Sequence, residues 1–139
     1  MIFTIRTVLR AEARNRINFM KESYWKKRVK AFGYAFQGIN TLFRKEAHAK
    51  IHLLAAILVV AAGFIFNLER WEWCAILICI GVVFMAEAIN TAVERVCDRV
   101  SPEKHPLIKD AKDIAAGAVL LFVFAAIAVG LIVFIPHFL

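Results

Sequence analysis

Between residues 85 and 98 the chain reads Met85-Ala86-Glu87-Ala88-Ile89-Asn90-Thr91-Ala92-Val93-Glu94-Arg95-Val96-Cys97-Asp98. In a helix with about 100° per residue, the three acids of this run share one face with Asn90. The run ends a stretch that is otherwise apolar enough to cross a membrane, where a carboxylate costs about 2.5–3.5 kcal/mol even on the mildest scale. Three acids on one face at a membrane boundary indicate metal or proton chemistry.

The composition is that of a small integral membrane protein. Of the 139 residues 61% are hydrophobic, whereas a soluble domain is nearer half apolar. The apolar excess lies in three blocks, and these predict an all-α protein with membrane spans at about 51–68, 73–93 and 114–135. We expect a basic amphipathic extension at 1–23 and one three-span domain at 24–139.

The N-terminal third is expected to lie on the membrane surface. In residues 1–22 and again in 24–47, apolar residues recur at steps of three and four with basic residues between them. This pattern predicts one or two amphipathic helices on the inner leaflet. For residues 1–22, a frayed and solvated tail is the alternative.

The distribution of basic residues sets the expected topology. Twelve of the 18 lysines and arginines lie in residues 1–50, five lie in 94–113, and only Arg70 lies between the first two apolar blocks. The positive-inside rule then places the N-terminus and the 94–113 loop in the cytoplasm. With a net charge of +7 and three spans, anionic lipid headgroups are a better partner than nucleic acid.

Glu87 is the deepest acid of the run. A general base at the level of the lipid headgroups would need such a carboxylate. The alternative is a structural acid that pairs with a lysine or arginine of a neighbouring helix. Asn90, one turn away, can bond either acid or a bound hydroxyl, or it can form a structural bond between helices.

Glu46 and Glu94 are candidate metal ligands. Glu94 lies about 10 Å along the helix from Glu87, and Glu46 lies at a matching depth on another segment. Because Mg²⁺ is usually held by one or two carboxylates plus substrate phosphates, this pair fits a metal–nucleotide site. Each acid by itself would more often be a solvated surface charge. Asp98 can cap loop donors, pair with Arg95 or Arg99, or line a nucleotide pocket.

The loop and helix start after residue 101 hold the remaining candidates. Lys112 can neutralise phosphate charge during phosphoryl transfer. Asp113 is also explained by its position near the expected helix start at Lys109–Asp113, where the helix dipole favours an acid. His105 can contact a nucleotide or be solvated. Since the chain has no glycine-rich phosphate loop, phosphate binding would depend on side chains and metal.

The run from Glu87 to Arg99 resembles the signature of the prokaryotic diacylglycerol kinase family, small three-span lipid kinases. The resemblance extends from about Lys27 to the end of the chain, without gaps between its blocks: Phe32-Gly33-Tyr34-Ala35-Phe36-Gln37-Gly38, Glu46, Glu103-Lys104-His105 and Ala111-Lys112-Asp113. It implies a homotrimer in the bacterial inner membrane, with a surface helix in each subunit and active sites shared between subunits.

The resemblance also implies roles for individual residues. Glu87 would be the base that takes the proton from the lipid hydroxyl, supported by Asn90 and Lys112. Glu46 and Glu94 would hold Mg²⁺ on ATP. Contacts with ATP are implied for Lys27, Tyr34, Glu46, Glu94, Asp98, Glu103, Lys104, His105, Lys112 and Asp113.

The lipid substrate stays open between undecaprenol and diacylglycerol. The segment Lys50-Ile51-His52 is more similar to the undecaprenol kinase branch of the family. Two other classes of protein compete with a kinase. A proton-coupled transporter would explain Glu87 but leave Glu46 and Glu94 unexplained, and a structural assembly protein explains the acidic face least well.

Overall fold

The computed structural model describes residues 2–101 and 105–139, with side chains from residue 24 onward. These residues form α1 (Ile2–Lys45), α2 (Ala47–Ile65), α3 (Arg70–Val100), α4 (Pro106–Phe134) and the short 3-10 helix η1 (Ile135–Phe138). The described part of the chain is helical without any strand, so the all-α prediction is confirmed. The chain divides into two compact units, 1–41 and 42–139, which are taken separately below.

The first unit is formed by α1. The sequence pattern allowed two amphipathic segments, and the structure has one uninterrupted helix through both. The physical reason is that no proline, glycine or capping sequence separates residue 22 from residue 24, so nothing ends the helix there. Side chains from residue 24 to residue 40 are exposed, and the Arg28 guanidinium lies over the ring of Tyr24, 4.8 Å from its centroid.

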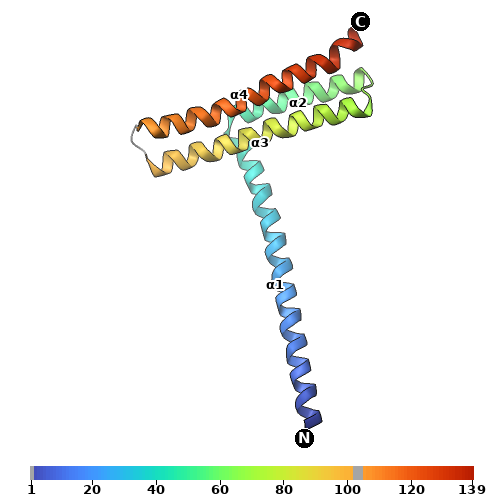
Figure 1. Cartoon of the computed structure of the whole chain (residues 1–139), viewed down its shortest axis with the longest axis vertical. Coiled ribbons are helices and arrows are strands. Elements are labelled where there is room, and N and C mark those ends of the chain that lie inside the picture. The colour runs from blue at the N-terminus through green and yellow to red at the C-terminus, as the bar shows by residue number, and fades with distance from the viewer. Residues whose placement is uncertain (1, 102–104) are drawn as a thin grey trace. The chain divides into compact units, whose positions relative to one another are not determined.

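The second unit is a bundle in which α3 packs against both α2 and α4 (Figure 1). Within the described residues, three helical segments are long and apolar enough to cross a membrane, at Ala47–Ile65, Arg70–Val100 and Pro106–Phe138. This confirms the predicted number of spanning helices. α4 begins at Pro106 rather than near Lys109–Asp113, because proline is favoured in the first turn of a helix and its fixed φ suits that position.

The buried core lies near the turn that joins α2 to α3. Leu68, Ile76 and Val133 are the buried apolar residues of this cluster. Asn67 has φ 53° in the turn, a left-handed conformation that asparagine tolerates better than most residues. The turn therefore reverses the chain without a glycine, and the opposite end of the bundle carries most of the charged residues.

Candidate functional site

The polar face of α3 is buried at one end and exposed at the other. Glu87 is 4% exposed and Asn90 is 8% exposed, whereas Glu94 is partly buried and Asp98 is exposed. The side-chain nitrogen of Asn90 donates a hydrogen bond of 3.0 Å to Oε1 of Glu94, as residues one turn apart on the same face can. The acids thus form a graded series from the apolar interior of the bundle to its charged end.

Asn90 holds a buried acceptor without a partner in the described part of the chain, one turn from the buried residue Glu87. Among the residues that the structure describes, none forms a hydrogen bond or an ion pair with the Glu87 carboxylate, and Oδ1 of Asn90 is buried without a partner. Buried polar groups are normally hydrogen-bonded, so each unpaired acceptor needs an explanation. The Glu87 carboxylate, which has no partner among the described residues, can accept the one hydrogen bond that a hydroxyl group donates.

Glu46 lies in the break between α1 and α2. Its backbone is extended, with φ −97° and ψ 123°, and its side chain does not cap α2. The carboxylate instead reaches α3, where Nη2 of Arg95 donates to Oε1 of Glu46 over 2.7 Å. The sequence alone suggests Arg95 only as a partner of Asp98, although its position directly after Glu94 indicates that it lies beside the expected metal site.

The oxygen atoms near this break fit a magnesium–nucleotide site. The Arg95 ion pair holds the carboxylate of Glu46 beside α3, where Glu94 is the preceding residue. The described side chains contain no group of three or more His, Cys, Asp and Glu residues that could hold a metal ion together. Two carboxylates and the unpaired amide oxygen of Asn90 are nevertheless the hard donors that Mg²⁺ takes when phosphates complete its coordination.

Lys112 brings a positive charge from α4 to the end of the polar face. Its Nζ lies 2.8 Å from Oδ1 of Asp98, and it is also within electrostatic range of Glu94. Asp98 is therefore paired with Lys112 and not with Arg95 or Arg99, two partners that the sequence allowed. One turn earlier on α4, Lys109 forms an ion pair with Asp113.

The structure describes some of the remaining nucleotide candidates, each in its own part of the chain. His105 is the N-cap of α4, where its Nδ1 accepts a hydrogen bond of 3.2 Å from the backbone N–H of Leu107. Lys27 and Tyr34 are exposed on α1 in the first unit. Glu103 and Lys104 lie outside the described residues. The roles of these residues in ATP binding stay predictions.

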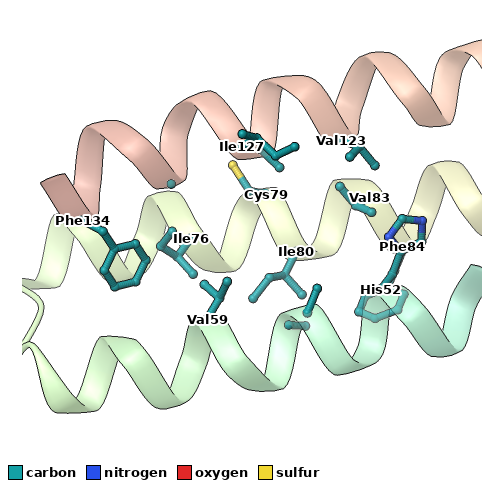
Figure 2. Close-up of a pocket in the computed structure, with 14 residues that line it drawn as sticks. His52, Val59, Ile76, Cys79, Ile80, Val83, Phe84, Val123, Ile127 and Phe134 are labelled. Carbon is teal, nitrogen blue, oxygen red and sulfur yellow. The ribbon is translucent and has the colours of Figure 1, made fainter.

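An apolar cavity of about 230 Å³ lies between α2, α3 and α4 (Figure 2). Its walls include Val59, Ile80 and Val123, and His52 lies at the end of the cavity away from Phe134. In the sequence, His52 lies at the start of the predicted first span, within the segment that is similar to the undecaprenol kinase branch. Nothing in the sequence could have revealed the cavity, because it depends on how three helices pack against each other.

The fold and the polar face define a small membrane protein that brings acids, a lysine and unpaired acceptors to one end of an apolar bundle. Residues 33–134 match the family model described as prokaryotic diacylglycerol kinase. The undecaprenol kinase of Bacillus subtilis (strain 168) is 40% identical over 107 residues, which cover 77% of this chain and 87% of that protein.

Two further relatives are diacylglycerol kinases. The one from Pseudomonas aeruginosa is 31% identical, over 72% of this chain and 81% of its own length. The one from Escherichia coli (strain K12) is 28% identical, over 79% of this chain and 90% of its own length. The chain therefore belongs to the prokaryotic diacylglycerol kinase family and is a lipid kinase, with a lipid and ATP as its substrates. These matches give no support to the transporter alternative.

Proposed function

We propose that this protein phosphorylates undecaprenol, with Glu87 as the general base. The observation that carries the mechanism is the buried carboxylate of Glu87 beside the unpaired oxygen of Asn90. The choice of undecaprenol is supported by the relative from Bacillus subtilis that bears the name undecaprenol kinase, and by the segment Lys50-Ile51-His52.

The reaction begins at the buried end of the polar face. Glu87 accepts the proton of the lipid hydroxyl, and Asn90, one turn farther on, uses its side-chain nitrogen to hold Glu94. The hydroxyl oxygen then forms a bond to the γ-phosphorus of ATP, and the bond from that phosphorus to the β-phosphate oxygen breaks to release ADP. The hydrocarbon chain stays within the bilayer, so only the hydroxyl has to reach the site.

The nucleotide lies at the shallower end of the face in this proposal. Glu46 and Glu94 hold Mg²⁺, which neutralises charge on the β- and γ-phosphates when it is bound. Arg95 restrains Glu46 over 2.7 Å, and Asn90 restrains Glu94 over 3.0 Å. The two ligands are therefore preorganised, which reduces the cost of ordering them when ATP arrives.

Lys112 stabilises the charge that spreads over the transferred phosphoryl group. Its ion pair with Asp98 keeps the ammonium group at the end of α3. His105 uses Nδ1 to cap α4, so its Nε2 stays available for a phosphate oxygen. The remaining ATP contacts are assigned to Lys27, Tyr34, Asp98, Glu103, Lys104 and Asp113.

The enzyme is a homotrimer in the bacterial inner membrane, with its N-terminus in the cytoplasm. The charge distribution along the chain supports this orientation, because the basic segments 1–50 and 94–113 then both face the cytoplasm. α1 lies on the inner leaflet as a surface helix, with exposed Trp25, Phe32 and Phe36 turned toward lipid. Neighbouring subunits complete each active site.

The test is a phosphorylation assay with purified protein in mixed micelles, in which undecaprenol and diacylglycerol compete for limiting ATP. We expect Mg²⁺-dependent formation of undecaprenyl phosphate, with a higher kcat/KM for undecaprenol than for diacylglycerol. A higher kcat/KM for diacylglycerol would reverse the substrate assignment. The Glu87→Gln variant serves as the blank for contaminating kinases.

A further inference from the structure

The apolar cavity is elongated along the bundle. Ile76 and Phe134 lie at one end and His52 and Phe84 at the other (Figure 2). Along α3, the eight steps from Ile76 to Phe84 correspond to about 12 Å. The cavity therefore extends from near the α2–α3 turn part of the way toward the end of the bundle that carries the polar face.

The wall of the cavity continues into the polar face of α3. The lining residues Ile76, Ile80 and Val83 follow each other at steps of four and three, and the next step of four reaches Glu87. Such steps keep residues on one helical face. Glu87 thus lies on the same face of α3 as the residues that line the cavity, about 5 Å along the helix axis beyond Phe84.

The chemistry of the lining suits a hydrocarbon. Of the fourteen lining residues, only His52 and Cys79 carry a polar side-chain atom. Dry apolar cavities of about 150 Å³ already bind a molecule as large as benzene, so about 230 Å³ admits a slender hydrocarbon segment. The same volume is too small for two lipid chains side by side.

We propose that this cavity binds the first segment of the hydrocarbon chain of a single-chain lipid alcohol, so that the hydroxyl emerges at Glu87. The site selects against diacylglycerol, whose second chain has no place in it. The inference rests on the proposed function, since a lipid alcohol must be the substrate. His52 marks the end of the cavity from which the polar headgroup emerges.

A direct test is photolabelling without ATP. Farnesol carrying a diazirine is irradiated with the purified protein, and labelled residues are mapped by mass spectrometry. We expect labels on the lining residues Cys79, Ile80 and Val123, which excess undecaprenol suppresses and equal diacylglycerol leaves largely intact. Labels spread equally over the exposed residues Leu121 and Phe124 would overturn the proposal.

Competition separates the possible occupants. Equal suppression by undecaprenol and diacylglycerol would contradict selection for a single chain. Labelling of the cavity that neither lipid suppresses would mean that ordinary bilayer chains occupy it. Absence of any label from the lining would mean that protein, such as a helix of a second copy, fills the cavity. Unsuppressed labelling and absence of labelling would each overturn the proposal.

A pair of neighbouring alanines provides the matched variants. Ala126 lines the cavity, whereas Ala125 is exposed and outside the lining. Ala126→Leu should lower kcat/KM for undecaprenol by about tenfold or more, because it fills space that the chain needs. KM for ATP should stay unchanged, and Ala125→Leu should behave like the native enzyme. Equal effects of the two substitutions would overturn the assignment.

The two proposals can fail separately. If undecaprenol suppresses the photolabel but is not phosphorylated, the cavity assignment stands and the proposed function fails. If undecaprenol is phosphorylated but does not suppress the label, the function stands and the cavity assignment fails. Because photolabelling uses the native chain, this test also holds if Ala126→Leu does not fold.

Discussion

Nη2 of Arg95 lies 2.7 Å from Oε1 of Glu46. This contact joins the charged C-terminal part of α3 to the break between α1 and α2. The side chain of Arg95 is 46% exposed and that of Glu46 is 27% exposed. Ion pairs with this much exposure contribute only about 0–1 kcal/mol to stability. The pair therefore serves mainly to hold the Glu46 carboxylate beside α3, where Glu94 is the residue before Arg95.

Glu46→Gln is expected to weaken metal binding while leaving the fold intact. The substitution removes one anionic ligand, so the Mg²⁺ concentration for half-maximal activity should rise by on the order of tenfold or more. Thermal unfolding in micelles should change little, because the lost ion pair is weak. An unchanged Mg²⁺ dependence would contradict the ligand role, and Arg95→Gln serves as the control for loss of the ion pair alone.

Glu87→Gln is expected to abolish turnover without destabilising the protein. The amide cannot accept the proton of the lipid hydroxyl, but it fills the same volume. It also avoids the cost of a carboxylate in an apolar environment, about 2.5–3.5 kcal/mol at the centre of a bilayer. The melting temperature should therefore be equal to or higher than that of the native protein.

Nucleotide binding separates this prediction from misfolding. Glu87→Gln should retain an ATP·Mg²⁺ affinity close to native, measured by equilibrium binding in the absence of lipid. If the variant loses nucleotide binding but keeps residual turnover, Glu87 is not the general base. Thr91→Ser, on the same buried part of α3, serves as a conservative control that should keep activity.

Local patterns in the sequence were sufficient for the helices and for the polar face. The steps that place Glu87, Asn90 and Glu94 on one face are fixed by the helical repeat, so they could be predicted without tertiary information. The end of α3 was predictable too, since Pro102 disfavours helix at Ser101, and the structure ends α3 at Val100.

Pairings between helices could not be predicted in this way. The bonds from Arg95 to Glu46 and from Lys112 to Asp98 join residues on different elements, and which pairs form depends on how the helices pack. The cavity beside His52 likewise exists only once three helices are in place. The single length of α1 was missed for a different, local reason: the change of pattern near residue 23 suggested two segments, although no residue there breaks the helix.

Lys112→Ala is expected to reduce turnover far more than Lys109→Ala. Both lysines lie in the first turns of α4, and each forms an ion pair, with Asp98 and Asp113 respectively. Only Lys112 is proposed to stabilise the transferred phosphoryl group, and removing one such group typically lowers kcat by about 10²–10³. The measurement is kcat at saturating ATP and lipid. If both variants lower kcat equally, the loss reflects a general effect of positive charge, and the specific role of Lys112 is contradicted.

The close approach of α2 and α3 at Gly63 gives a prediction for stability. A Cβ atom at residue 63 would lie 2.8 Å from Cη2 of Trp73, closer than real Cβ contacts come, and 3.1 Å from Cδ1 of Leu68, which is a tight contact. Overpacking of this kind costs about 1–3 kcal/mol, more than the gain of up to about 1 kcal/mol from replacing glycine by alanine in a helix. Gly63→Ala should therefore lower the melting temperature.

Two variants make the cause of this destabilisation specific. At Gly81 in α3 nothing lies within 4 Å of an added Cβ, so Gly81→Ala should leave the melting temperature equal or higher. Replacing Trp73 by phenylalanine removes the ring atoms nearest to residue 63, so Gly63→Ala should cost less in a Trp73→Phe background. Because the clash lies near the α2–α3 turn, far from Glu87 along α3, kcat at low temperature should stay close to native. Equal destabilisation with and without Trp73 would show that the indole ring is not the obstacle.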